Sequence, residues 1–504
     1  MEAMATDMAS FPLLSVLIGL PFAAAVFLWL LPATQARAVA LLASSAELAI
    51  ALWVAWHFDP SRNGFQWVEK ADWLPSVNVH YLLGVDGLSL LFLPFSALLF
   101  LVLLLSSRPA LLPRLYFALL LSLQGMTIGI FTALDLVLFF LFWELTLLPI
   151  YFLVSIWGIG PQRRFAATQY TLWMLFGGAL ILFGFVVVAG MQGQSALAAL
   201  PLHERLTFAL PALLSVPLPV EWQLPAFLLL VTGFALKTPV VPFHVWLPVM
   251  AMEGPVAVVA MMTGLKLGAY GMIRFALPLA PQAAMEWSWL LASFGVIGIF
   301  YGGLMALNQS NLRRLLAYSS ISHVGMVLLG ISTMTVQGIQ GAVLQLINFT
   351  VVSSGLFLLA GYLHRRTDSC EWRHLGGVVQ TMPQATVFFF FFGVAGLGMP
   401  LTSGFPAEQL MLLGTISLHK GAALAAVGGQ ILAAGYFLLF YRRAFLGPVT
   451  QRAVREAADL QRSELYALLA LAIPVLLFGL FPGWLLQLTQ VPAIHWLSHM
   501  GREF

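Results

Sequence analysis

The chain has 504 residues, of which 61% are hydrophobic and only 9% are charged, with a formal net charge of +3. Runs of more than about 18 apolar residues recur along it, which is typical of a polytopic helical membrane protein and excludes a soluble globular domain. Because Cys370 is the single cysteine, an internal disulfide and a multi-cysteine iron–sulfur or zinc site are excluded. No Rossmann glycine fingerprint or Walker loop is present, so we expect no nucleotide, no nucleic-acid partner, and no cofactor or metal held by this chain.

Hydropathy predicts an all-α membrane protein with about 14 transmembrane helices. The first apolar run is long enough to be a retained span rather than a cleaved signal. The link 57–84 is polar and contains tryptophan, and the link 191–224 is rich in proline, which predicts only short structure there. The predicted spans are 11–31, 38–57, 85–106, 115–132, 134–156, 168–190, 225–248, 255–278, 287–306, 314–331, 339–363, 384–413, 422–446 and 465–489.

The placement of basic residues predicts the orientation of these spans. Of the 23 lysines and arginines, 15 lie in or beside the odd-numbered links and 5 lie in the even links and tails. By the positive-inside rule the odd links face the cytoplasm, stroma or matrix, and both termini face the periplasmic or lumenal side. The odd-link residues are Arg37, Arg108, Arg114, Arg163, Arg164, Arg313, Arg314, Arg365, Arg366, Arg373, Arg442, Arg443, Arg452, Arg455 and Arg462. The even-link and tail residues are Arg62, Lys70, Arg205, Lys420 and Arg502.

The positions of proline and glycine predict an internal repeat. They interrupt the seventh span at 239–242 and the twelfth at 398–406. Two groups of five spans with a broken helix at matching places are typical of an inverted-repeat transporter, because an odd number of spans per repeat reverses its orientation. The predicted segments are an N-terminal three-helix segment at 1–110, a first repeat at 111–280, a second repeat at 281–450, and a C-terminal helix and tail at 451–504.

Charged residues inside the spans are candidates for chemistry, because a charge near the bilayer centre costs about 2.5–3.5 kcal/mol. Glu144 in FFLFWELTLLPIYF would stay protonated unless a cation lies within about 4–6 Å. Lys237 in GFALKTPVVPFHVWLP, beside the first break, is its natural partner. The functional interpretation is a switchable pair, whose opening favours release of the lysine's proton. The alternative is a static ion pair that pins two helices.

Further candidates extend this path along the chain. Lys266 in MMTGLKLGAYGMIRF would be the central proton carrier, since snorkelling to an interface is a long reach from about 11 residues inside its span. Glu408 in LTSGFPAEQLMLLG follows the second break and is either an exit-side acid or a cap facing headgroups. Lys420 lies near a span end, where snorkelling is an equal interpretation. Asp86 lies near a span start and is interpreted first as a helix cap, whereas Asp135, also near a span start, is either a helix cap or an entrance acid.

Neutral polar groups could complete the path. His323 in AYSSISHVGMVLLG lies among hydroxyl residues that can hold water, so it is either a proton relay or a hydrogen-bonded structural histidine. His244, beside the first break, has the same two interpretations. Asn348 cannot take up a proton near neutral pH but can hold water. Glu253 is a candidate for the mouth of the path.

Four motifs in order resemble a known family over about residues 80–450. They are FWELTLLPIYFLVSIWG, KTPVVPFHVWLP, GLKLGAYGMIRF and NLRRLLAYSSISHVGMVLLG. The chain is similar to the antiporter-like membrane subunits of the complex I (NDH-1) superfamily, of the NADH dehydrogenase subunit 4 type, also called M-type or NdhD-type. The resemblance implies two inverted five-helix repeats and proton translocation driven by quinone reduction elsewhere. It implies proton-transfer roles for Glu144, Lys237, Lys266, His323 and Glu408.

The resemblance also implies a setting. Quinone, iron–sulfur clusters and the electron donor would be bound by partner subunits. The partners would be other membrane subunits of an NDH-1 or complex I assembly, especially other antiporter-like subunits, together with lipid. The larger L-type subunit has a long lateral helix, and we expect none in this chain.

Three positions depart from the family pattern. A WLPDAH-like string is replaced by WLPVMAM, with Val249 and Ala251, and Asn348 replaces a helix 11 histidine. These changes concern the cytosolic uptake route and one relay step, and they indicate a specialised paralogue. The stretch IWGIGPQRRFAATQYTLWMLFGG resembles photosynthetic subunits more than mitochondrial ones. The expected location is therefore a bacterial plasma membrane or a thylakoid membrane with plastoquinone, and a variant linked to carbon dioxide uptake is one alternative.

Two other classes of function compete with a proton-pumping subunit. A subunit of a multisubunit Na⁺/H⁺ antiporter has the same motifs, but a sodium site would need several clustered oxygen ligands, and this sequence offers scattered hydroxyls. A non-transporting scaffold would be favoured by loss of a charged residue from the path. The sequence retains all of them, namely Glu144, Lys237, Lys266 and Glu408.

Overall fold

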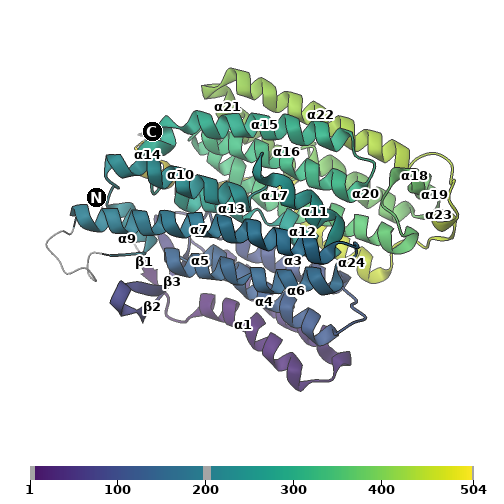
Figure 1. Ribbon diagram of the computed structural model, residues 1–504, viewed down its shortest axis with the longest axis horizontal. Coiled ribbons are helices and arrows are strands. Elements are labelled where there is room, and N and C mark those ends of the chain that lie inside the picture. Colours follow the sequence, from purple (N-terminus) through teal and green to yellow (C-terminus); the bar gives the residue numbers. More distant parts are fainter. Residues whose placement is uncertain (1–5, 197–205, 502–504) are drawn as a thin grey trace.

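Residues 6–196 and 206–501 are described by the computed structural model, which is a bundle of long helices with a small sheet at one end (Figure 1). Twelve helices of this described chain are long and apolar enough to cross a membrane. Two shorter apolar helices, Phe92–Ser106 and Pro383–Gly396, lie in the third and twelfth predicted spans. The prediction of a helical membrane protein is confirmed. Helices dominate because a lipid core offers no partners for backbone N–H and C=O groups, and a helix satisfies them internally.

The helices of the first half are α1 Leu13–Phe27, α2 Ala36–Trp56, α3 Phe92–Ser106, α4 Pro113–Thr132, α5 Leu136–Leu145, α6 Leu147–Trp157, α7 Arg163–Ala196, α9 Leu210–Ser215, α10 Val220–Lys237, α11 Trp246–Glu253, α12 Val256–Gly264, α13 Leu267–Gly271 and α14 Pro281–Glu286. Those of the second half are α15 Ser288–Leu307, α16 Leu312–Ser332, α17 Val336–Thr367, α18 Trp372–Leu375, α19 Val378–Thr381, α20 Pro383–Gly396, α21 Gly404–Leu418, α22 Lys420–Ala444, α23 Arg452–Glu456, α24 Arg462–Leu480 and α25 Gly483–His499. Short turns are η1 Leu28–Leu30, η2 Ala33–Gln35, η3 Pro75–Val77, η4 Phe243–Val245 and the π-helical η5 Met272–Ala276.

Interruptions divide three of the membrane helices. The two predicted breaks are confirmed, because α10 and α20 each end before a non-helical segment, at 238–242 and 397–403 respectively. A third break, at 265–266 between α12 and α13, was not predicted. It has no proline to mark it, and it places Lys266 at a helix end instead of inside a continuous helix.

A three-stranded sheet is the main feature that the all-helical prediction missed. Strand β2 Phe65–Leu74 lies between β1 Thr6–Met8, to which it is parallel, and β3 Val79–Val85, to which it is antiparallel. Its pairing with β3 shifts register twice, so the two-residue alternation of a regular strand is interrupted. The carboxylate of Glu69 on β2 accepts the N–H groups of Leu14 at 2.6 Å and Ser15 at 3.0 Å, which ties the sheet to the start of α1.

The C-terminal segment also differs from its prediction. The last span was expected as one helix over 465–489 followed by a tail, but α24 ends at Leu480 and α25 begins at Gly483. Short structure in the proline-rich link is confirmed by α9. Arg205 and Arg502, which entered the charge count, lie outside the described residues.

The links alternate between the two ends of the bundle. One cavity is lined by residues of even links, namely 62–65, Leu214 and Pro278, together with residues 492–499 of α25. Another is lined by residues of odd links, including 106–109, Trp157 and Arg365. Because β1 pairs with β2 of an even link, both ends of the described chain lie at the even-link end, on the left of Figure 1.

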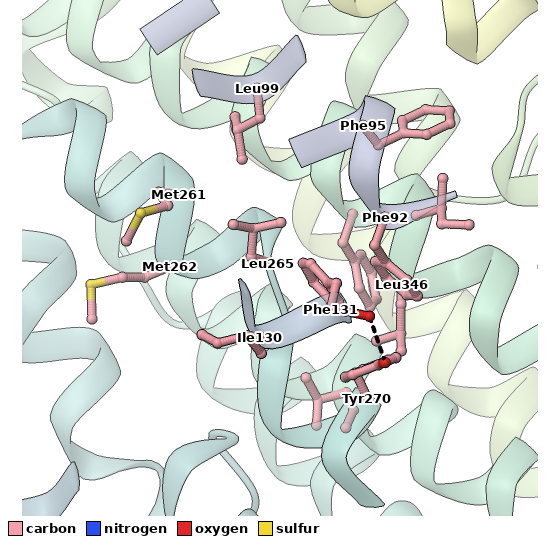
Figure 2. Packing of buried hydrophobic residues seen from close by; sticks show 14 of the residues in the cluster. Phe92, Phe95, Leu99, Ile130, Phe131, Met261, Met262, Leu265, Tyr270 and Leu346 are labelled. Atoms are coloured by element: carbon pink, nitrogen blue, oxygen red, sulfur yellow. Dashed lines mark hydrogen bonds between the residues drawn. The ribbon is translucent and has the colours of Figure 1, made fainter. Parts of the chain in front are cut away.

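The centre of the bundle is formed by α4, α12, α16 and α17, which are the most deeply buried of the spanning helices in the described chain. Figure 2 shows side chains from α3, α4, α12 and α17 meeting there. Phe92 stacks on Phe131 with ring centroids 4.6 Å apart, and the Tyr270 hydroxyl donates to the Phe131 carbonyl at 3.3 Å. This packing holds the break at 265–266 in the middle of the protein.

Cys370 gives a test of the link after α17. Its thiol is buried and donates to the Ala360 carbonyl at 3.3 Å, and burial raises the pKa of the thiol to about 11. Since the thiolate is the reactive form, we expect a water-soluble maleimide to leave Cys370 unmodified in native membranes at mildly alkaline pH and to label it after denaturation in detergent. Mass spectrometry of the tryptic peptide measures the label. Rapid labelling of the native protein would show that this link is open.

Candidate functional site

The first predicted pair is present. Lys237, the last residue of α10, donates from Nζ to the carboxylate of Glu144 near the end of α5. The Lys237 side chain is 1% exposed and that of Glu144 is 16% exposed. The ammonium also lies 4.6 Å from the centre of the Trp143 ring, a distance at which a cation is attracted to the ring face. The second carboxylate oxygen of Glu144 is buried and has no partner among the described residues, so the pair is incompletely satisfied.

Glycines on α7 make room for this ion pair. A Cβ atom at Gly178 would overlap the Glu144 carboxylate, and one at Gly177 would lie 3.2 Å from Cγ of Lys237. Gly190, on the same helix, faces open space. The carboxylate is therefore seated directly against the α7 backbone.

Lys266 lies in the central break, and no carboxylate of the described residues pairs with it. Its Nζ donates to the Ser320 hydroxyl on α16 at 2.6 Å and lies 5.8 Å from the Phe349 ring centre. One cavity is lined by both Lys237 and Lys266, so the two lysines face a common space. Ser320 is one of the hydroxyl residues of the AYSSISHVGMVLLG segment that surround His323 in the sequence.

His323 links α16 to the second break. Its Nδ1 lies 2.8 Å from the carbonyl oxygen of Ser319, and its Nε2 lies 2.9 Å from that of Gly396. A neutral imidazole carries one N–H and can donate to only one of these carbonyls, whereas the protonated ring donates to both. The Ser319 hydroxyl is 2.6 Å from that of Tyr436 on α22. Gain or loss of a proton at His323 therefore changes the hydrogen bonding between α16 and α20.

Glu408 lies at the far end of this row. It is buried on α21, and its Oε2 accepts the side-chain amide of Gln430 at 2.8 Å. A Cβ at Gly398 would overlap the Glu408 carboxylate, and the backbone of Gly398 has a φ of +65°, which glycine adopts most easily. Both predicted acids are thus seated against a glycine of another segment.

Asn348 connects α17 to the same break. Its side-chain oxygen accepts the Ser403 hydroxyl at 2.7 Å, and its side-chain nitrogen lies 3.4 Å from Oε1 of Gln345. Asn348 also lines a cavity with Ser320 and His323. The residue that replaces the family histidine is therefore still part of the polar row.

Three cavities follow one another along these residues. The first contains Lys237 and Lys266, the second contains Ser320 and His323, and the third contains His323 and Glu408. The hydrogen bond from Lys266 to Ser320 joins the first to the second, and His323 lines both the second and the third. All five predicted proton-transfer residues thus lie in one row, which we call the polar axis.

The remaining candidates from the sequence, His244, Glu253 and Lys420, lie apart from this row or at its edge. His244 is buried, its Nδ1 has no partner in the described chain, and its ring lies 4.7 Å from that of Tyr301. The Glu253 carboxylate accepts the backbone N–H of Gln162 at 2.7 Å, so it holds the link between α6 and α7 in place. Lys420 is exposed at the start of α22.

Several partners were not identified from the sequence. Gln430 and Tyr436 lie six residues apart on α22 and both face the polar axis; two isolated polar residues in an apolar helix were the available signal. Asp86 was predicted to cap the helix of the third span, but α3 begins only at Phe92 without a side-chain cap; Asp86 instead accepts the N–H groups of the turn after β3 and forms a buried ion pair with Arg274 at 2.6 Å. Within residues 6–196 and 206–501, no group of three or more His, Cys, Asp and Glu side chains could hold a metal ion.

Comparison with known proteins identifies the chain. The family model described as "NADH:quinone oxidoreductase/Mrp antiporter, TM" matches residues 133–433, the part that contains the polar axis. The chain belongs to this family. It is 32% identical to NADH-quinone oxidoreductase subunit M of Rickettsia typhi, with 96% of this chain and 98% of the relative covered. It is 36% identical to NAD(P)H-quinone oxidoreductase chain 4 of a Synechococcus species, with 96% and 92% covered.

A solved structure agrees with these relatives. A chain of respiratory complex I from Thermus thermophilus with bound NADH superposes with a TM-score of 0.87 at 29% identity, covering 97% of this chain and 100% of that one. The resemblance to antiporter-like subunits of the M or chain 4 type is confirmed.

Substituting Gly178 of this M-type chain tests whether the contact of the Glu144 carboxylate with the α7 backbone matters, without changing a charge. In Gly178→Ala the new methyl must displace the Glu144 carboxylate, and overpacking of this kind costs about 1–3 kcal/mol. We expect fewer protons translocated per quinone reduced by the assembled complex in sealed vesicles. Gly190→Ala, on the same helix and facing open space, is the matched control and should behave as wild type. Equal pumping by both variants would contradict the role of the seat.

Proposed function

We propose that this chain is the proton-translocating M-type membrane-arm subunit of a quinone-reducing complex of the NDH-1 or complex I type. The observation that carries the proposal is the polar axis, in which buried titratable groups are joined by cavities and hydrogen bonds from Glu144 to Glu408. Such groups are expensive in a bilayer and are typical of proton paths.

The transfer begins at the ion pair. While Glu144 and Lys237 are in contact, the carboxylate stabilises the ammonium. When a movement in a neighbouring subunit separates them, the lysine loses that stabilisation and releases its proton into the cavity shared with Lys266. The partial exposure of Glu144 allows such a movement to act on the pair from outside the chain.

The proton then passes along the remaining residues of the polar axis. Lys266 is held by a hydroxyl instead of a carboxylate, so no fixed negative charge opposes loss of its proton. His323 accepts the proton and holds both neighbouring carbonyls while charged, then releases one of them as the proton moves to Glu408. Glu408, held by Gln430, is the exit-side acid.

The topology that fits this path has fourteen crossings, with α3 and the α20–α21 pair counted as spans. In this proposal the repeats are 111–280 and 281–450, and the even-link end, which holds both chain ends, is periplasmic or lumenal. The electron donor, iron–sulfur clusters and quinone belong to partner subunits, and other antiporter-like subunits adjoin this one. The host membrane is a bacterial plasma membrane or a thylakoid membrane.

The decisive experiment replaces Glu144 in the assembled complex. In Glu144→Gln the lysine loses its anionic partner, so we expect the number of protons translocated per quinone reduced in sealed vesicles to fall by this subunit's whole share. Blue-native electrophoresis checks assembly. Glu456→Gln is the matched control, because Glu456 forms an exposed ion pair with Arg452 at 2.7 Å, and it should pump as wild type.

The other functions are outcomes of the same experiment. Unchanged proton stoichiometry in Glu144→Gln with an intact complex would support a scaffold. Proton movement that requires sodium, is driven by an imposed ion gradient and proceeds without quinone reduction would support a Na⁺/H⁺ antiporter subunit.

A further inference from the structure

A second buried carboxyl lies outside the polar axis. Glu47 is near the middle of α2 and is 0% exposed, and neither of its carboxylate oxygens has a hydrogen-bond partner in the described chain. The sequence SSAELAIALW contains it, but it was not among the predicted site residues. Nothing in the function proposed above uses it.

No cation on the described helices that pack on α2 is placed to neutralise this carboxyl. The helices that pack on α2 are α1, α3 and α4. Helices α1 and α3 contain no titratable residue, and the titratable residues of α4 are Arg114 and Tyr116 in its first turn. On α2 itself, Arg37 lies about 15 Å along the axis and donates to the Leu105 carbonyl at 2.7 Å, and His57 follows the opposite end. An ionised Glu47 would be an isolated buried charge, so the resting group is protonated and is ionised only while a proton is in transit to the neighbouring cavity.

Two polar residues lie within one helical turn of Glu47 along α2 and the adjoining α4, and we call the three residues a polar cluster. Ser44 lies three residues earlier on the same buried face of α2, and its hydroxyl oxygen accepts the side-chain amide of Gln124 on α4 at 2.9 Å. The side-chain oxygen of Gln124 is also buried without a partner among the described residues. The contact between α2 and α4 therefore holds two polar groups, the Glu47 carboxyl and the Gln124 oxygen, that have no hydrogen-bond partner in the described chain.

The cluster lies one helical turn from the polar axis. Because α2 and α4 are separated by one crossing, they run in the same direction, and the bond from Gln124 to Ser44 sets their register. Glu47 lies about one turn beyond Ser44 on α2, and Thr127 lies about one turn beyond Gln124 on α4. Glu47 and Thr127 are therefore at the same level along the two helices. Thr127 lines the cavity of Lys237 and Lys266.

We propose that Glu47, Ser44 and Gln124 form a side branch of the polar axis, and that Glu47 gives its proton to this cavity and recovers one in each turnover. The step moves a proton from the carboxyl oxygen, through water admitted beside Thr127, to the amine of a lysine that has lost its own proton, and the carboxylate is reprotonated by the next proton that Lys237 releases into the same cavity. The inference rests on the proposed proton translocation and extends it to the N-terminal helices, which lie outside the two repeats.

Glu47→Gln separates a working acid from a structural one, because glutamine keeps the shape and neutrality of the protonated side chain but cannot release a proton. We expect the assembled complex to form, to reduce quinone, and to translocate fewer protons per quinone than wild type. Infrared difference spectra taken on reduction should show the carbonyl band of a protonated carboxylic acid that changes in wild type and is lost in Glu47→Gln.

Ser96→Ala is the matched control. Ser96 is a buried hydroxyl on α3 that donates to the carbonyls of Phe92 at 2.6 Å and Leu93 at 3.0 Å in its own helix, so its loss should change neither readout. Wild-type stoichiometry and an unchanged band in Glu47→Gln would overturn the inference and leave Glu47 as a neutral packing group. If Glu144→Gln pumps normally as well, the proposed function itself fails; if only Glu47→Gln does, the side branch alone fails.

Discussion

An ammonium group buried within a bilayer must be met by an acceptor, and the two central lysines of this protein are met in different ways. Lys237 has a carboxylate, whereas Lys266 has only the Ser320 hydroxyl and an aromatic face. An ion pair holds its proton strongly until it is opened, while a lysine on a neutral acceptor is held less strongly. One cavity thus contains two buried lysines, of which one is held by an anionic acceptor and the other by a neutral one.

The breaks in the helices supply the groups that these side chains need. A continuous helix uses its own carbonyls, but a break releases them, and the carbonyl of Gly396 beside the second break is what His323 meets. The break at 265–266 similarly places Lys266 at the start of α13 with its side chain free to reach α16. The irregular backbone is tolerated because it lies inside the protein and not against lipid.

Sequence reasoning succeeded where burying a residue without a partner would cost much free energy. A buried Glu and a buried Lys each require a partner, so the pair of Glu144 and Lys237 could be predicted, and prolines identified the first break. The break at Lys266 could not be predicted, because it has no proline and its glycines are equally suited to close helix packing. The hydrogen bond from Lys266 to Ser320 could not be predicted either, because it depends on which face of α16 turns toward the centre of the bundle.

The sheet and the partners on α22 were missed for a related reason. The strand β2 has two register shifts, so its alternation is hidden. Gln430 and Tyr436 are polar but uncharged, and a membrane helix can carry such residues at little cost. Their contribution depends on tertiary contacts, which bring α22 beside α15 and α21.

Gly178 and Gly398 occupy equivalent structural positions relative to the two acids of the polar axis. Each removes a side chain where a carboxylate from another helix must rest, and neither takes part in proton transfer. Among related proteins, Gly178 has no such reason to persist once its acid is gone, whereas Gly398 is favoured also by its positive φ. Paired change of glycine and acid across the family would therefore distinguish subunits that keep a working acid from those in which the acid has become dispensable.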